Sequence, residues 1–142
     1  MAEQRRMRES QGFSQLLRDH LAEWSERTGI TVEVWALPEQ EVPPKVADNV
    51  CATVREALDN VARHSAARVV SIALTVGRSG LRLTVSDGGR GFEPGTTGRG
   101  IVAMHAYFAE IGGRLTVNPV PGAGTTVSGF VPAEMLIRHA GA

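Results

Sequence analysis

The chain of 142 residues has very little cysteine and lysine, and each shortage excludes a class of site. Cys51 is the single cysteine, so no disulfide can form within the chain. It falls in a helical apolar pattern, and we interpret it as a small buried hydrophobe, not a reactive thiol. Lys45 is the single lysine and follows two prolines. This position excludes a Walker A phosphate loop, which needs a Gly-Lys-Ser/Thr sequence.

The chain also lacks an excess of charge and a long hydrophobic run. Fifteen basic residues balance fifteen acidic ones, so no overall field attracts the chain to nucleic acid or to an anionic membrane. We expect neither nucleic-acid binding nor direct membrane contact. The longest apolar run, residues 69–76, falls far short of the roughly 20 residues of a membrane span. The first ten residues have no apolar core of the secretory-signal kind, and a cytoplasmic domain is predicted, whether or not a longer parent protein is membrane-anchored.

The length and the 42% of hydrophobic residues are typical of one globular domain with one core. Helical periodicity covers residues 13–29, 45–65 and 100–111, and strand patterns cover 30–35, 68–76, 81–86, 114–117 and 125–131. This order predicts an α/β two-layer sandwich, a mainly antiparallel mixed sheet of about five strands with three helices on one face. Residues 1–10 are expected to be a linker or frayed helix start, 11–132 the domain, and 133–142 a C-terminal tail with room for a short helix.

The helix predicted over residues 45–65 carries a polar stripe beside its apolar one. At about 100° per residue, five polar side chains fall on one side of this helix and border the apolar face: Asn49, Thr53, Glu56, Asn60 and His64. A polar stripe in that position is better placed to line a cavity than to face bulk water.

Three groups of residues are weak signals alone, because each is more often a solvated position, a turn or a helix cap. Together they predict a nucleotide site. The amide oxygen of Asn60 is a hard neutral ligand suited to Mg²⁺. One turn earlier, Glu56 can polarise a hydroxyl, a water or an imidazole near the terminal phosphate. The other two groups are Asp87 with Gly89 and Gly91 at the end of a strand, and Gly98 with Gly100 at the start of a helix.

Asp87 can accept a hydrogen bond from the 6-amino group of adenine, where guanine has an oxygen. ATP would therefore be preferred to GTP by about 1–3 kcal/mol. Gly89 and Gly91 let the backbone approach the base, whereas Gly98 and Gly100 let it wrap the phosphates at a helix N-terminus. Residues 93–99 are predicted to be a lid that is disordered without nucleotide.

Residues 55–65, 87–92 and 98–104 resemble the N, G1 and G2 boxes of one ATP-binding domain. Sensor histidine kinases, DNA gyrase, the mismatch-repair ATPases and the ninety-kilodalton heat-shock chaperone share it. Within that superfamily, roughly residues 11–132 are most similar to two-component histidine kinases of the nitrate-sensor and desaturase-sensor type. The resemblance implies the α/β sandwich of that family with ATP and Mg²⁺ as ligands. It also implies phosphoryl transfer to a histidine on a separate dimerisation and phosphoacceptor domain, and a downstream response regulator as partner.

The roles of the family's residues are implied position by position. Asn60 is implied to be the magnesium ligand, Glu56 the acidic residue of phosphoryl transfer, and Asp87 the residue that recognises adenine. The other implied nucleotide contacts are Gly89, Gly91, Gly98, Gly100, Thr125 (to adenine through water), Arg63 and His64. Two departures from the family pattern are Gly88, where Asn or Asp is usual, and residues 104–107, where relatives usually carry Arg and Glu.

An acceptor histidine followed by Asp or Glu is missing from the sequence. None of the four histidines has that context: His20, His64, His105 and His139. We therefore expect a catalytic fragment that binds ATP without being able to phosphorylate itself, and that is either cut from a longer sensor or acts on an acceptor in trans.

Three other functions are weighed against a histidine kinase domain. An anti-sigma-factor serine kinase has a similar domain, and a non-catalytic interaction module would have lost ATP. A Rossmann-type dinucleotide binder fits residues 98–103. However, no predicted strand leads directly into Gly98, and no acidic residue follows about 20 positions later.

Overall fold

The structure is a computed structural model that describes residues 2–88, 98–120, 122 and 124–141. Its elements are α1 (Ala2–Thr28), β1 (Thr31–Ala36), α2 (Pro44–Asn60), a π-helical turn (Val61–Ser65), β2 (Val69–Gly77), β3 (Gly80–Asp87), α3 (Arg99–Glu110), β4 (Arg114–Val120), β5 (Gly124–Pro132) and α4 (Ala133–Ala140). The strands form one sheet in the order β1-β2-β3-β5-β4. Among the strands that the structure describes, β1–β2 is the only parallel pair. The predicted sandwich with a five-stranded mixed sheet is confirmed.

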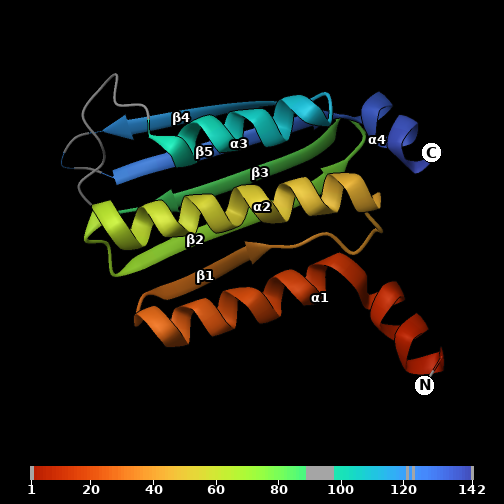
Figure 1. The fold of residues 1–142 in the computed structure, drawn as a ribbon, viewed down its shortest axis with the longest axis horizontal. Helices are drawn as coiled ribbons and strands as arrows, with labels where there is room; N and C mark the ends of the chain where they lie inside the picture. The colour runs from red at the N-terminus through yellow and green to blue at the C-terminus, as the bar shows by residue number, and fades with distance from the viewer. Residues whose placement is uncertain (1, 89–97, 121, 123, 142) are drawn as a thin grey trace.

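The helices cover one face of the sheet. Figure 1 shows α2 and α3 crossing that face, with α1 beside β1 and α4 at the end where the chain terminates. No helix in the described part of the chain has the length and apolar composition that a bilayer crossing requires.

Helix α1 begins earlier than the apolar periodicity predicts. Residues 2–11 are helical, and the backbone leaves helical geometry at Gly12 (φ 35°, ψ −132°). The part that follows Gly12 packs on the core through Leu17, Leu21 and Trp24, all buried. Apolar spacing therefore located the packed part of α1 but not its first turns, where polar residues give no periodic signal.

The sheet buries alternate residues, and this fixes which side chains face the helices. In β3, Leu83 and Val85 are buried under the helix layer, so Asp87 points to the same face. Asp87 lies opposite Thr125 of β5 in the antiparallel register, and directly opposed residues share a face. The end of β3 and the start of β5 thus present a carboxylate and a hydroxyl to the helices.

Helix α2 forms because its apolar residues recur at helical spacing and Pro44 stands in its first turn, where a missing N–H costs nothing. Val46, Val50 and Val54 are fully buried. The helix ends in the π-helical turn, and Ala66 then adopts a left-handed conformation (φ 55°) that turns the chain into β2. π-Helical turns are rare and occur frequently at functional sites.

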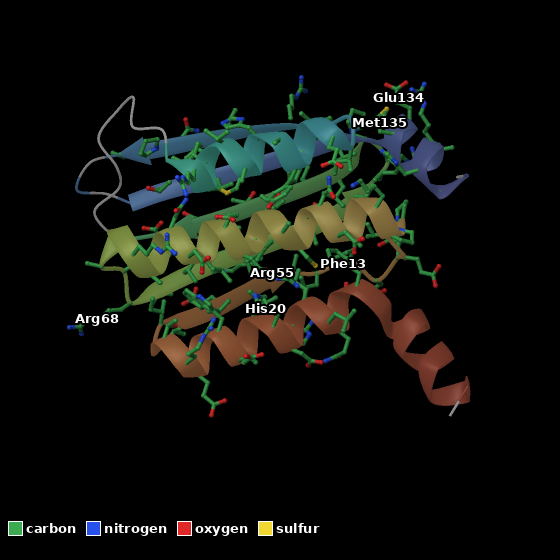
Figure 2. All side chains as sticks on the ribbon, viewed as in Figure 1. Phe13, His20, Arg55, Arg68, Glu134 and Met135 are labelled. Atoms are coloured by element: carbon green, nitrogen blue, oxygen red, sulfur yellow. The ribbon has the colours of Figure 1, made fainter. Side chains whose placement is uncertain are left out.

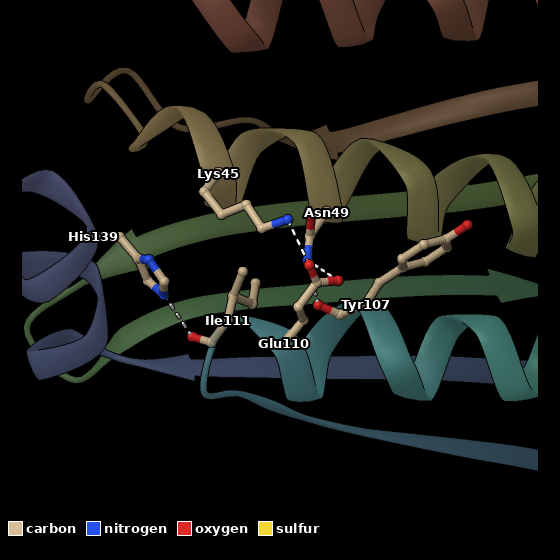
Figure 3. Close-up of polar contacts among 6 residues, drawn as sticks. All are labelled: Lys45, Asn49, Tyr107, Glu110, Ile111 and His139. Atoms are coloured by element: carbon tan, nitrogen blue, oxygen red, sulfur yellow. Dashed lines mark hydrogen bonds and ion pairs between the residues drawn. The ribbon is translucent and has the colours of Figure 1, made fainter. Parts of the chain in front are cut away.

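Polar contacts fix the start of α2 to the end of α3 (Figure 3). Asn49 Nδ2 donates to the Tyr107 carbonyl oxygen at 2.8 Å, and Lys45 Nζ pairs with Glu110 Oε1 at 2.6 Å. Thr53 is completely buried and donates to the Asn49 carbonyl at 2.8 Å. The expectation that the whole polar stripe lines a cavity is therefore wrong for Asn49 and Thr53, because α3 packs against this part of α2.

Candidate functional site

The described residues of the predicted site gather at one end of the molecule. Figure 1 shows that α2 ends, α3 begins, β3 ends and β5 begins at this end. The sequence places Glu56 and Asn60 on the last turns of α2, Gly98 and Gly100 at the start of α3, and Asp87 at the last position of β3.

Glu56 and Asn60 lie against the first turn of α3. A Cβ placed on Gly100 would be 3.0 Å from Glu56 Oε2 and 3.1 Å from Asn60 Oδ1. These distances are shorter than most van der Waals contacts of a Cβ, so a side chain at position 100 would displace the carboxylate or the amide. Glycine at this position therefore brings the N-terminus of α3 close to both side chains. The structure thus brings together the residues of the predicted N and G2 boxes.

The first turn of α3 offers backbone donors at the same place. Gly98 is the N-cap in an extended conformation, and no side chain caps the helix within the described residues. The first amides of a helix have no intrahelical acceptor, and the helix dipole adds positive potential there. Such an end can bind a phosphate group. A Cβ on Gly98 would meet no described atom within 4 Å, so packing does not explain this glycine.

Asp87 and Thr125 form the second part of the site. Asp87 is half-buried, and Thr125 is only 6% exposed. Among the described residues, the Thr125 hydroxyl is a buried side-chain oxygen with no hydrogen-bond partner. An unsatisfied buried hydroxyl is costly, and a ligand or an ordered water bound there would remove that cost. This hydroxyl therefore fits the proposed contact with adenine through water.

Gly124 is a residue of this site that the sequence analysis did not single out. It has a left-handed backbone (φ 103°), and a Cβ there would overlap the carbonyl oxygen of Asp87. Only glycine lets β5 begin so close to the end of β3. The sequence does show that Gly124 stands in a Gly-rich turn before a strand. That pattern does not predict which glycine lies against the backbone of Asp87.

A cleft of about 590 Å³ opens beside Asp87. Its lining comes from the turn that follows α2 and from the facing ends of β2 and β3: Ala66, Ala67, Arg68, Val69, Ser71, Ser86, Asp87 and Gly88. Figure 2 shows the Arg68 side chain extending away from the ribbon. Glu56 and Asn60 do not line this cleft. Asp87 is therefore the residue that the cleft and the predicted site share.

Several predicted residues are not placed. Gly89, Gly91 and most of the predicted lid lie outside the described residues, as does the side chain of His64. Arg63 is exposed on the π-helical turn, three positions after Asn60.

Burial raises the pKa of the Cys51 thiol to about 11, so the thiol is protonated at neutral pH. A protonated thiol is a poor nucleophile. This agrees with the prediction that Cys51 is not a reactive thiol, although the side chain packs against the core only partly buried and not fully buried as predicted.

Comparison with known proteins identifies the family. Residues 45–135 match the family model of the histidine kinase-, DNA gyrase B-, and HSP90-like ATPases. The chain is 35% identical over 127 residues to the sensor histidine kinase LiaS of Bacillus subtilis (strain 168), covering 87% of this chain and 35% of LiaS. It is 28% identical over 118 residues to the sensor histidine kinase YxjM of the same organism, covering 82% of this chain and 29% of YxjM. The chain thus spans about a third of the length of these relatives.

Solved structures share this fold. The histidine kinase domain of a blue-light activated histidine kinase from Erythrobacter litoralis superposes with a TM-score of 0.77 at 25% identity, covering 91% of this chain and 64% of that one. The ATP-binding domain of PrrB from Mycobacterium tuberculosis gives a TM-score of 0.66 at 17% identity, covering 84% and 92%, and supports the fold.

The chain belongs to the family of histidine kinase-, DNA gyrase B- and HSP90-like ATPases. Within it, the chain is homologous to the catalytic ATP-binding domains of sensor histidine kinases.

Proposed function

We propose that this chain binds ATP with Mg²⁺ and donates the γ-phosphoryl group to a histidine of a separate dimerisation and phosphoacceptor domain. A response regulator would then receive the phosphoryl group from that histidine. The observation that carries this proposal is the approach of Glu56 and Asn60 to Gly100, at the end of the sheet where Asp87 faces the helix layer.

Asp87 and Thr125 would bind the base. The Asp87 carboxylate accepts a hydrogen bond from the 6-amino group of adenine, and the Thr125 hydroxyl holds an ordered water that contacts the ring. The buried hydroxyl without a described partner supports this assignment. Gly89 and Gly91 would let the backbone approach the base.

Asn60, Glu56 and the start of α3 would act on the phosphates. Asn60 Oδ1 contributes a neutral oxygen ligand, and Mg²⁺ takes only one or two such protein oxygens besides phosphate and water. The bound ion would neutralise charge on the phosphate oxygens during transfer. Glu56 would accept a hydrogen bond from the acceptor imidazole and orient its nucleophilic nitrogen toward the γ-phosphorus. Backbone amides at Gly98 and Gly100 donate to phosphate oxygens, and Arg63 and His64 border them.

We also propose that the parent protein is a kinase of the nitrate-sensor and desaturase-sensor type. The N-box sequence of residues 55–65 supports this assignment. Sequencing the parent reading frame upstream of Met1 tests it, because a helical segment with the acceptor histidine of that type should precede the domain. A parent without such a segment would contradict both the subtype and its expected partner.

Titration with a fluorescent ATP analogue tests the binding site. We expect magnesium-dependent binding in the micromolar to millimolar range. Asp87→Asn should bind the analogue at least tenfold more weakly, because the neutral amide oxygen is a weaker acceptor for the adenine amino group than the carboxylate and the charge-assisted hydrogen bond is lost. Asn60→Ala should lose the magnesium dependence. Unchanged affinity in Asp87→Asn would count against the adenine contact.

Transfer of labelled phosphate to a supplied phosphoacceptor domain tests the reaction. Glu56→Gln should bind ATP and fail to transfer, because the uncharged amide is a weaker hydrogen-bond acceptor. The chemical stability of the product separates the alternatives, since phosphohistidine is lost in acid and phosphoserine survives. An acid-stable product would favour a serine kinase of the same superfamily.

A further inference from the structure

Two arginines and a phenylalanine form a cluster on the face of the sheet that the helices leave open. Arg82 of β3 and Arg114 of β4 are both register partners of Phe130 on β5. Their guanidinium carbons lie 4.7 Å and 5.3 Å from the centre of the Phe130 ring. The neighbours Leu83 and Leu115 are buried under the helices, so this row of three residues points to the opposite face.

The cluster carries positive charge that the described residues do not neutralise. In the described part of the chain, the only ion pair joins Lys45 to Glu110, and both arginines of the cluster are exposed. The residues that surround them on the same face of β3, β4 and β5 are uncharged: Thr84, Ser86, Thr116, Asn118, Thr126 and Ser128. A local positive field therefore exists on a chain whose formal net charge is zero.

The stacking on Phe130 prepares both guanidinium groups for binding. A guanidinium held over an aromatic ring has already lost side-chain freedom in the unbound protein. Less conformational entropy is therefore lost when a ligand binds. The N–H groups in the plane of the guanidinium remain available, and their geometry suits a bidentate pair with a carboxylate. Arginine and aromatic residues are also enriched at the centres of protein–protein interfaces.

We propose that the cluster of Arg82, Phe130 and Arg114 binds an acidic segment of a partner protein. Side-chain carboxylates pair with the two arginines, and an apolar side chain between them contacts Phe130. Two cations favour this ligand over an anionic membrane or nucleic acid, because those surfaces attract clusters of several basic residues. The cluster lies on the sheet face opposite to Glu56, Asn60 and Gly100, so the proposal does not depend on ATP binding.

A titration with a defined acidic peptide tests the proposal. The probe is a fluorescein-labelled peptide of glutamate and leucine, and the matched peptide has glutamine at every glutamate position. The uniformly ¹⁵N-labelled chain is titrated with each peptide. We expect the acidic peptide to shift the amide signals of residues 82, 114 and 130 and the Nε signals of both arginines, with an affinity that falls as salt rises. The glutamine peptide should produce no such shifts.

The double variant Arg82→Gln with Arg114→Gln should bind the acidic peptide at least tenfold more weakly. Arg78→Gln is the matched control, because Arg78 is an exposed arginine in the β2–β3 turn, away from the ring. Both variants should keep the wild-type affinity for the ATP analogue, which separates this proposal from the nucleotide site. Equal peptide affinity in the double variant and in Arg78→Gln would overturn the proposal. Two other results would overturn it. In the first, the same arginines mediate binding to phosphatidylglycerol vesicles and not to the peptide. In the second, they mediate dimerisation of the chain, seen in sedimentation as a dependence of mass on concentration, and not peptide binding.

Discussion

Gly100 leaves little space for a side chain between α3 and the polar end of α2. Gly100→Ala should weaken binding of a fluorescent ATP analogue about tenfold or more, because the new methyl group would displace Glu56 or Asn60. Alanine is the better helix former, so the free energy of unfolding should stay the same or rise by up to about 1 kcal/mol. Equilibrium titration and urea unfolding on the same preparation measure the two effects.

Gly77→Ala is the control for this substitution, because a Cβ at Gly77 would meet nothing within 4 Å. It should change neither the affinity nor the stability by a comparable amount. Wild-type nucleotide affinity in Gly100→Ala would mean that the approach of α3 to Glu56 and Asn60 has no role in binding.

His20 gives the fold a dependence on pH. Burial lowers the pKa of His20, nearby Arg55 and Arg27 lower it further, and Glu23 and Asp59 act in the opposite direction. Figure 2 shows His20 on α1 near Arg55 of α2. Since the folded state favours the neutral imidazole, its stabilising contribution is present above about pH 6.5. It is lost as the pH falls below that value toward the lowered pKa of the folded state.

The expected result is a fall in thermal stability between about pH 7.5 and pH 5.5 that is shallower in His20→Gln. The difference between the two proteins isolates this group from the carboxylates, which titrate in both. Parallel curves of melting temperature against pH would show that His20 does not contribute.

Among the elements, the contact between α2 and α3 depends on one buried amide. Asn49 is 5% exposed and donates to a carbonyl oxygen in the last turn of α3. The carbonyl groups of that turn have no regular intrahelical donor. Asn49→Ala should lower the free energy of unfolding by about 1–3 kcal/mol, because it leaves that carbonyl without its donor. Urea unfolding measures the loss.

Lys45→Met is the comparison within the same contact. The Lys45–Glu110 pair is about half exposed on each side, and the hydrogen bond from Lys45 lowers the pKa of Glu110. Water and salt screen such a pair, so the stability loss should be clearly smaller than in Asn49→Ala. A larger loss in Lys45→Met would contradict the assignment of the buried amide as the main link.

The polar stripe of α2 shows how far periodicity predicts a site. Helical spacing correctly placed Asn49, Thr53, Glu56 and Asn60 on one side of the helix. It could not predict that α3 would cover the first two and leave the last two facing its glycine-rich start, because the covering element is far away in the sequence. Motif order supplied that information for Glu56, Asn60 and Gly100, since the boxes were expected to meet.

For the whole molecule, the element order predicted the layered fold and most element boundaries to within a few residues. The parallel β1–β2 pair was not specified, because strand alternation gives the buried face of a strand and not its neighbour. The stacking of Arg82 and Arg114 on Phe130 was missed for the same reason, since it depends on the register of three strands. Long-range pairing is the information that a single sequence carries least clearly.

Helix α4 packs at the end of the molecule opposite to the candidate site (Figure 1). Met135 lies so close to Gly112 that a Cβ there would overlap it, and His139 Nε2 lies 3.2 Å from the Ile111 carbonyl oxygen (Figure 3). The backbone of Ala133 also donates to the Ser79 carbonyl at 3.0 Å. These contacts make α4 part of the domain's packing, whereas no described contact connects it with Glu56, Asn60 or Asp87.

Truncation after Pro132 should therefore separate stability from function. Removing α4 exposes the surface that Met135 and Leu136 partly cover, and we expect a loss of roughly 2–4 kcal/mol in the free energy of unfolding. The affinity for the ATP analogue, measured at a temperature where the truncated chain is still folded, should stay within about twofold of the full chain. If affinity fell together with stability, the far end of the sheet would be energetically coupled to the nucleotide site through α2, which runs from one end to the other.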